Sequence, residues 1–586
     1  MEREVADERA TAHERIGISW ALVAVLLGAV ALRVPMFTGT LPDLYWHDEL
    51  NFIEGALRIG AGEIRGASFG GYAHGTLTFF LLFGAFAFWF VLGRAVGLFA
   101  GVNDFVLAYA SDPTPFILVV RAITLAASVG TVGLTYVVGR WLFGARAGLF
   151  AALLFAGSFQ SIHMTYGKED SLFALLMLAA YLSAVCAMEA PQKPWRFVAA
   201  GAAVAAASAV KYFGLAGFGL LAVAALLGSW PNLRAAARNA GWAVAGFVVA
   251  FVCFMPAVLL DTSRLVGSFL NLREGNAGIL VEAPSGGGAW YGYLWTTYAV
   301  AGGVVLTALF YAGAAVLLRE RNRAGVLLLV YPAGLITALT TVLLFGKGVE
   351  VPYYQLSTVP FLCLAAGRLL DRMTAGGTPL RVAAYGLAAL AVAGNVSDAI
   401  RFQRLIHAED SRTSARKWIE THVPSGASIL MEGAVFTFVL EAPQLKETPA
   451  ALTRDLKRNL EQGGSGRMAQ AKLRAVEESG RAGPRYDLHK VYNLTAEDIE
   501  RYPHEYVVAR SEAGRRVIEA STRPHQMVFS VQPPHPRLFQ IVPLLSIADI
   551  RTLQAAPLLS EAEPHLTMGP SIWVFRTPAP APMIRG

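Results

Sequence analysis

The sequence predicts a polytopic α-helical membrane protein that carries a soluble domain at its C-terminus. Of its residues, 55% are apolar and only 16% are charged, and the mean hydropathy is +0.47, which is far from the balance of a soluble domain. Uninterrupted apolar segments of about 17 to 25 residues, long enough to cross a bilayer as helices, run from Ile16 almost to Asn395. Beyond Asn395 the apolar runs stop.

These observations divide the chain into three parts. Residues 1–15 are a mixed-charge, acid-rich segment that we expect in the cytoplasm. Residues 16–397 form the transmembrane domain, whose first span lacks a small-residue cleavage site and is therefore expected to be retained rather than removed as a signal peptide. Residues 398–586 form an extracytoplasmic soluble α/β domain.

The basic residues indicate membrane orientation rather than nucleic-acid binding. The net charge is +7, but much of the Lys and Arg lies in short loops between apolar segments, as orientation in a membrane requires. Cys186, Cys253 and Cys363 are far apart in apolar stretches, so they form neither a metal-ligand spacing nor a disulfide framework. We interpret them as packing residues.

Loop charge also predicts the topology. The Lys- and Arg-rich loops should be cytoplasmic; they lie at Arg140–Arg146, Lys193–Arg196, Arg234–Arg238, Arg319–Arg323 and Arg368–Arg381. With the N-terminus also inside, this gives about 11 transmembrane helices, near residues 16–37, 116–139, 147–163, 171–188, 197–210, 213–229, 240–259, 290–318, 324–345, 355–370 and 380–397. The protein is then a multi-pass protein of the cell membrane (the inner or plasma membrane).

The apolar stretch from Thr76 to Phe99 must not cross in this topology, because a crossing there would place the later basic loops outside. Its interruptions at Gly84, Gly93 and Arg94 also favour a segment that does not span. We therefore predict a re-entrant or interfacial helix for this stretch.

An acidic pair, Asp48 and Glu49, follows the first span, where charge is costly to keep and usually marks a site. A carboxylate there suits a general base that removes a proton from a hydroxyl, while a helix N-cap or an interfacial salt bridge is an equal alternative. Asp170, beside Lys168 and Glu169, begins another outward end. An acid at that position also complements a helix N-terminus, so capping alone would explain it.

Two cations interrupt apolar runs. Lys211 lies within Ala202–Gly217 and suits an anionic ligand such as a phosphate near the outer leaflet, with snorkelling to the interface as the alternative. Arg121 lies six residues into a span. A structural ion pair with an outer-loop carboxylate and a contact to substrate are both open for it.

The remaining candidates are histidines and aromatic residues. His47, His74 and His163 could join the acidic pair around a divalent cation, but they show no tight ligand spacing, so we assign no metal site and keep a divalent cation only as an alternative. Tyr353 and Tyr354 lie where a loop enters a span, as aromatic anchors do. A loop with Trp290, Tyr291, Tyr293 and Trp295 after Ser285–Gly288 could supply aromatic faces for a sugar, a mobile lid or an interfacial belt.

The order of these pieces resembles the GT-C glycosyltransferases, specifically the family of protein O-mannosyltransferases and aminoarabinose transferases, which use polyprenyl-phosphate-linked sugars. The resemblance covers roughly residues 20–370 and rests on the motifs Asp48-Glu49, Val120-Arg121, Gly139–Gly144 followed by Ala147–Leu154, Tyr166–Asp170, Val210–Tyr212, and Tyr353-Tyr354 with Pro360. The chain departs from the family at Tyr72–Gly75, where a Pro-Pro pair is common, and at Tyr353-Tyr354, where Arg-Tyr is often found.

The resemblance implies a GT-C-like fold and an inverting transfer of sugar from a polyprenyl-phosphate carrier to an acceptor hydroxyl on a protein, a lipid or a glycan. It implies that Asp48 is the catalytic base, Asp170 a second acid in the same cavity and Lys211 a phosphate contact. We take three residues as catalytic candidates, Asp48, Glu49 and Asp170, and six as substrate-binding candidates, Lys211, Arg121, Lys168, Tyr353, Tyr354 and His74.

The soluble C-terminal part alternates helix and strand signals, which predicts an α/β domain. An amphipathic helix is expected at Ser414–His422, and strands at Ser428–Met431, Glu505–Ala509, Gln526–Val531 and Ser571–Phe575, while Gly463–Gly466 is expected to form a surface loop. No nucleophile, metal or phosphate motif stands out here, so we expect an acceptor-binding or structural role.

Two other functions remain open. A membrane transporter or flippase for lipid-linked sugars would also have many spans and a few membrane-level charges, but such proteins often carry internal repeats, and none is clear here. A catalytically silent scaffold is the second alternative, against which the acids Asp48, Glu49 and Asp170 argue.

Overall fold

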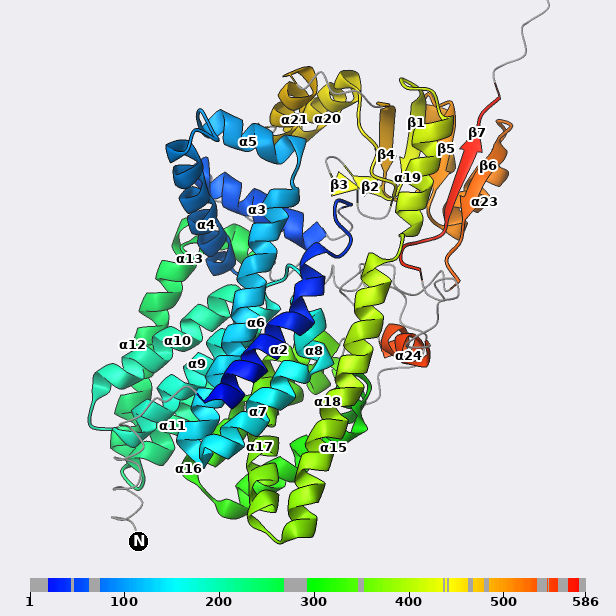
Figure 1. Ribbon diagram of the computed structural model, residues 1–586. Coiled ribbons are helices and arrows are strands. Elements are labelled where there is room, and N and C mark those ends of the chain that lie inside the picture. The colour runs from blue at the N-terminus through cyan, green and yellow to red at the C-terminus, as the bar shows by residue number, and fades with distance from the viewer. Residues whose placement is uncertain are drawn as a thin grey trace, which may run out of the picture.

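The fold consists of a bundle of long apolar helices and a smaller α/β domain that stands on one end of the bundle (Figure 1). The computed structural model describes residues 19–43, 47–62, 74–267, 292–345, 352–435, 438–439, 442–461, 467–478, 484–534, 545, 547–556 and 567–578. Several predictions fall outside these residues: the N-terminal segment 1–15, the loop with Ser285–Gly288, Trp290 and Tyr291, and the loop Gly463–Gly466.

The bundle helices run to and fro along one direction (Figure 1). They are α2 (Trp20–Thr38), α6 (Thr114–Phe143), α7 (Ala145–Gly157), α9 (Asp170–Glu189), α10 (Pro194–Val210), α11 (Phe218–Ser229), α12 (Leu233–Phe254), α15 (Thr297–Glu320), α16 (Arg323–Phe345), α17 (Val359–Ala375) and α18 (Thr378–His407). Short helical pieces lie between them: α8 (Phe159–His163), η1 (Tyr212–Gly217), α13 (Ala257–Leu260), η2 (Gly292–Thr296) and η3 (Pro352–Thr358).

The helix lengths fit a multi-pass membrane protein. In the part of the chain that the structure describes, 9 helices are long and apolar enough to cross a membrane, and α7 and α10 are shorter apolar helices. The number of crossings stays a prediction. The predicted span at 147–163 is not one helix, because α7 ends at Gly157 and α8 begins at Phe159.

The predicted basic loops share one end of the bundle. We call the end that carries the α/β domain the domain end and the other the far end. The helix α18 runs from the far end to the domain end and continues to His407, past the predicted domain boundary at residue 397. Following the chain back from α18 places the predicted basic loops at the far end, so the predicted outer residues share the domain end.

The stretch predicted not to cross forms α4 (Thr76–Ala95), and both of its ends lie at the domain end. At its start, Thr76 Oγ1 donates a hydrogen bond to the carbonyl of Phe254, where α12 ends. Near its other end, the Trp89 ring lies 4.8 Å from the ring of Phe116, in the first turn of α6. Although length and composition alone make α4 a candidate span, this placement supports the non-crossing interpretation.

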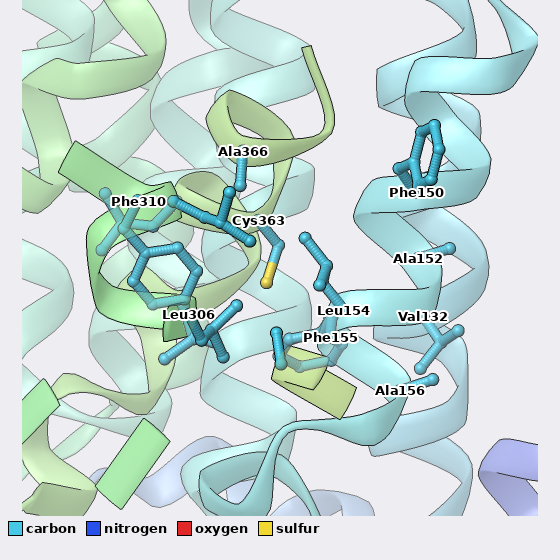
Figure 2. Packing of buried hydrophobic residues seen from close by; sticks show 14 of the residues in the cluster. Val132, Phe150, Ala152, Leu154, Phe155, Ala156, Leu306, Phe310, Cys363 and Ala366 are labelled. Atoms are coloured by element: carbon cyan, nitrogen blue, oxygen red, sulfur yellow. The ribbon is translucent and has the colours of Figure 1, made fainter. Parts of the chain in front are cut away.

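Small and apolar residues hold the bundle together. Figure 2 shows a core in which Leu154 and Phe155 of α7 lie near Phe310 of α15 and Cys363 of α17. Cys363 is buried there, as predicted for a packing residue, whereas Cys253 is exposed. Elsewhere a Cβ on Gly201 would lie 1.9 Å from the carbonyl oxygen of Ala243, so α10 and α12 approach as closely as small residues allow.

The α/β domain is built on a mixed five-stranded sheet of order β4-β1-β5-β7-β6. Its strands are β1 (Ser428–Glu432), β4 (Asp487–Val491), β5 (Tyr506–Ala509), β6 (Gln526–Val531) and β7 (Ile572–Arg576); β1 pairs in parallel with β4 and β5, and β7 pairs antiparallel with β5 and β6. A small antiparallel pair is formed by β2 (Ala434–Val435) and β3 (Phe438–Val439).

Helices cover both faces of this sheet. The first helix, α19 (Ser411–His422), packs on one face through Ala415 and Ile419, while α23 (Glu512–Glu519) contributes Ile518 to the other face. The remaining helices are α20 (Pro449–Glu461), α21 (Arg467–Glu478), α22 (Ala496–Arg501) and α24 (Ile547–Ala555). The four predicted strands and the predicted helix are thus confirmed, with ends shifted by a few residues, whereas β4 was not predicted.

The domain touches the bundle in several places. From α24, Gln554 Nε2 donates to the carbonyl of Val300 at 2.8 Å. The helix α21 lies against α5 (Val102–Ser111), and α3 (His47–Gly60) packs beside α4, all at the domain end (Figure 1). The domain is therefore docked over the end of the bundle that holds the predicted site.

Candidate active site

The residues taken above as catalytic or substrate-binding candidates all lie at the domain end, in one connected cluster. Its members come from segments far apart in the sequence: Asp48 and Glu49 from α3, His74 just before α4, Arg121 from α6, Lys168 and Asp170 at the start of α9, Lys211 after α10, and Tyr353 and Tyr354 from η3. Bundle helices that begin or end at the same level bring them together.

Glu49 and Arg121 form a buried ion pair. Arg121 Nε lies 2.7 Å from Glu49 Oε1 and Nη2 lies 2.9 Å from Oε2, the two-pronged geometry that guanidinium and carboxylate favour. Arg121 Nη1 also donates to the carbonyls of Phe37 and Gly39. Two roles were open for Arg121, a structural ion pair and a contact to substrate. The structure shows the ion pair, and its partner is Glu49.

Asp48 is the most accessible carboxylate of the cluster. Its side chain is 10% exposed, against 2% for Glu49 and 3% each for Glu169 and Asp170. Two basic side chains face it, Lys168 Nζ at 3.6 Å and His74 Nε2 at 3.9 Å, both beyond ordinary hydrogen-bond length. Asp48 thus faces two basic side chains and is the least buried acid of the cluster.

His74 lies between Asp48 of α3 and Glu169, which precedes α9. His74 Nδ1 lies 3.2 Å from Glu169 Oε1. Burial by itself lowers the pKa of His74, but the adjacent carboxylates of Glu169 and Asp48 outweigh it and raise the pKa. Burial raises the pKa of Glu169, but His74 and Lys211 outweigh it, so that this pKa is lowered.

Glu169 had no predicted role of its own. The sequence signal that could have indicated it is its position in the charged triplet with Lys168 and Asp170, directly before an apolar span. Sequence cannot tell which member of such a triplet faces inward, because that depends on where the helix begins. The structure starts α9 at Asp170 and buries all three members of the triplet, Glu169 included.

Two lysines lie on either side of Asp170. Lys211 Nζ is 2.5 Å from Asp170 Oδ1 and 3.8 Å from Glu169 Oε1, and Lys168 Nζ is 4.0 Å from Asp170 Oδ2. Burial lowers the pKa of Lys168, but Asp48 and Asp170 outweigh it and raise the pKa. Lys168 therefore stays protonated near neutral pH, and Lys211 is held by carboxylates rather than snorkelling alone.

The tyrosines provide aromatic faces for these lysines. Lys168 Nζ lies 4.2 Å from the ring centre of Tyr353, and Lys211 Nζ lies 5.3 Å from that ring and 5.6 Å from the ring of Tyr354. A cation over an aromatic face is attracted by the ring quadrupole. Tyr353 and Tyr354 therefore belong to the cluster and are more than anchors at a membrane interface.

The histidines do not assemble into a metal centre in the described part of the chain, where no group of three or more His, Cys, Asp or Glu side chains is arranged to hold an ion. His163 lies apart from the cluster, stacked on Phe159 at 4.8 Å and bonded to the carbonyl of Phe159. The ring contacts and the hydrogen bond of His163 thus go to Phe159 and Phe402 in the core, not to Asp48 or Glu49, while a divalent cation itself stays an alternative.

The arrangement combines Asp48, the least buried carboxylate of the cluster, with Lys168 at 3.6 Å and with Lys211 on the adjacent Asp170. A carboxylate held near a desolvated site can accept a proton from a hydroxyl, and fixed cations can stabilise negative charge that develops on a neighbouring oxygen. The cluster is therefore suited to a reaction in which a hydroxyl attacks and an anion leaves.

Comparison with known proteins adds a family similarity. Residues 116–259 match the family model described as dolichyl-phosphate-mannose-protein mannosyltransferase. The match spans less than half of the chain, but it includes Arg121, Lys168, Asp170 and Lys211. No curated protein matches this chain.

Several solved structures are similar in fold. ArnT from Cupriavidus metallidurans bound to undecaprenyl phosphate is 14% identical with a TM-score of 0.49, covering 86% of this chain and 95% of that one. Its apo state is 18% identical with a TM-score of 0.40, covering 68% of this chain and 71% of that one. The Archaeoglobus fulgidus oligosaccharyltransferase tethered to an acceptor peptide is 12% identical with a TM-score of 0.48, covering 95% of this chain and 88% of that one.

At such low identities these structural similarities say nothing about activity. The family match does not depend on them, and it covers the segment that holds Arg121, Lys168, Asp170 and Lys211. Over residues 116–259, the chain is therefore similar to the dolichyl-phosphate-mannose-protein mannosyltransferases, which are of the GT-C type that the sequence motifs indicated.

Proposed function

We propose that this protein is an inverting glycosyltransferase that moves a sugar from a polyprenyl-phosphate carrier to an acceptor hydroxyl on the extracytoplasmic face of the membrane. The observation that carries the proposal is the position of Asp48, the most accessible carboxylate of the cluster, 3.6 Å from Lys168 Nζ. The similarity over residues 116–259 supports the class of reaction.

In the proposed reaction, Asp48 takes the proton of the acceptor hydroxyl as its oxygen attacks the anomeric carbon of the sugar. The new bond forms on the face opposite the phosphate, so that the configuration is inverted. The bond between the anomeric carbon and the phosphate oxygen breaks, and the lipid phosphate leaves with the electron pair.

The leaving phosphate gains negative charge, and Lys168 and Lys211 are the groups that we assign to stabilise it. Both are already paired with carboxylates, so a bound phosphate would share them with Asp48 and Asp170. Buried Asp170 Oδ2 has no hydrogen-bond donor among the described residues, which leaves this part of the cluster able to rearrange around a ligand.

The location on the extracytoplasmic face follows from charge. The predicted basic loops occupy the far end of the bundle, which by the bias of cytoplasmic loops toward Lys and Arg would face the cytoplasm. The domain end, and the cluster with it, would then face outward. The proposal leaves the sugar open, and the acceptor is a hydroxyl of a protein, a lipid or a glycan.

The test is sugar transfer by purified protein in detergent from a panel of polyprenyl-phosphate sugars. Asp48→Asn keeps the shape of the side chain and removes the base, so we expect kcat to fall by about 10² to 10⁴. Asp104→Asn is the control, because Asp104 is an exposed acid that caps the backbone N–H of Ala100 in the α4–α5 connection.

The outcomes of the assay decide the role of Asp48 and distinguish a transferase from a flippase. Turnover by the wild type that is lost in Asp48→Asn and kept in Asp104→Asn would support the proposal, as would a product of inverted configuration. Full activity of Asp48→Asn would overturn the role of Asp48. Movement of the lipid-linked sugar across vesicles without any product would favour a flippase. Parallel assays with EDTA and with added Mg²⁺ would reveal any need for a divalent cation.

A further inference from the structure

The segment that precedes Asp48 and Glu49 in the chain is held from two sides. Residues Gly39–Asp43 follow α2, and Asp43 precedes Asp48 by only five positions. A segment this close to Asp48 along the chain limits where the start of α3 can lie. What fixes this segment therefore also bears on the position of Asp48.

On the bundle side the segment is held by Arg121. The guanidinium that pairs with Glu49 also donates to the carbonyls of Phe37 and Gly39, at 3.0 and 2.9 Å. Tyr166 adds a hydrogen bond from its hydroxyl to the carbonyl of Gly39 at 3.1 Å. One side chain, Arg121, thus ties the end of α2 to the start of α3.

On the other side the segment is held by the α/β domain. Thr413 Oγ1 donates to Asp43 Oδ2 at 2.6 Å, and Arg416 Nη2 lies 3.1 Å from Asp43 Oδ1 and 3.2 Å from Oδ2. Just before this contact, the backbone N–H of Thr40 donates to the carbonyl of Ile406 at 3.0 Å, near the end of α18. We call the contact of Asp43 with Thr413 and Arg416 the Asp43 clasp.

The helix α19, which provides Thr413 and Arg416 to the clasp, also packs on the sheet. In α19, Thr413 and Arg416 are three positions apart and share one face. Ala415 and Ile419, four positions apart, point to another face and are buried with Ile429 and Val574 of the sheet. A displacement of the sheet domain is therefore passed through α19 to Asp43.

We propose that the α/β domain positions the catalytic carboxylate through the Asp43 clasp, so that Asp43 and Arg416 are positioning residues of the reaction. The inference rests on the proposed function for its kinetic consequence. It assigns the domain a task in catalysis that is exercised through α19. Anything that binds the domain and shifts α19, an acceptor included, would then alter the position of Asp48.

Removal of the clasp should affect the rate more than donor binding. Arg416→Met keeps most of the stem and removes the charge, and Asp43→Asn removes the opposite charge. Because a misplacement of about 1 Å can cost on the order of 10² in rate, we expect each variant to lower kcat at least about tenfold while the KM for the donor changes little. The double variant should be no slower than the slower of the two single variants, since both remove the pair of Asp43 with Arg416; Arg416→Met also removes the partly exposed pair of Arg416 with Glu420.

Two controls keep the test specific. Lys417→Met removes the neighbouring charge on α19, but Lys417 is 57% exposed and pairs with Glu409, so kcat should not change. The exchanged pair Asp43→Arg with Arg416→Asp restores opposite charges and should recover part of kcat. Hydrogen exchange of the peptide that covers α3 gives a readout independent of turnover, and it should speed up in Arg416→Met while the melting temperature stays near that of the wild type.

The outcomes separate this inference from the proposed function. If the wild type transfers no sugar, the proposed function fails, but faster exchange confined to α3 would still support the clasp. Unchanged kcat and unchanged exchange in Arg416→Met would overturn the inference. Faster exchange throughout the chain with a lower melting temperature would also overturn it, because it would show a merely structural contact.

Discussion

The ion pair of Glu49 with Arg121 gives the sharpest test of how the cluster is built. Both side chains are buried, at 2% and 1% exposed. In Arg121→Met the carboxylate of Glu49 would remain in the interior without its donors. Removal of one partner of a buried pair typically costs about 3–5 kcal/mol, so we expect Arg121→Met and Glu49→Met each to lower the free energy of unfolding by about this amount.

The double variant should be far more stable than the sum of the two single variants predicts. With Met at both positions no charge is left buried, and replacement of a whole buried pair by apolar residues is often close to neutral. What remains is the loss of donors to the carbonyls of Phe37 and Gly39, which leaves a cost of about 1–3 kcal/mol. The assay is unfolding of the purified protein by a graded denaturing detergent in mixed micelles.

Additive costs in this cycle would refute the reasoning. So would single-variant costs below about 1 kcal/mol, as exposed pairs give, because the pair with Arg121 would then not be what compensates the burial of Glu49. Sugar transfer by the double variant is informative too. If Arg121 acts only by holding α3, a double variant that folds should keep measurable kcat.

Two further predictions concern a glycine and a pair of histidines. Gly167 has φ of +36° and a Cβ there would lie 1.9 Å from Glu49 Oε1, so Gly167→Ala should abolish transfer and lower the melting temperature. Gly62→Ala, at φ of +80° in open space, shares only the backbone strain and should keep activity. In the α/β domain, His504 Nε2 lies 3.2 Å from His525 Nε2, and burial lowers the pKa of both. Their protonation therefore favours the unfolded chain, stability should fall as the pH drops below their usual value of about 6.5, and the double His→Gln variant should show a smaller fall between pH 7.5 and 5.5. An equal fall in that variant would count against the pair.

Composition and periodicity were sufficient for the class of protein and for much of the α/β domain. Apolar run length and loop charge depend on the bilayer alone, so they can be read without any contact. The strand Gln526–Val531 was predicted to the residue. The edge strand β4 was missed because its sequence Asp487–Val491 has few apolar residues and depends on pairing with β1.

The sequence by itself determined which residues are candidates, because a charge kept near a membrane span needs a reason. Only the tertiary structure decided their partners. It committed Glu49 to Arg121, brought Glu169 against His74, removed His163 to the core and linked Asp43 to α19. These contacts join residues far apart in the chain, and local sequence patterns carry no information about which distant helix ends meet at the same level.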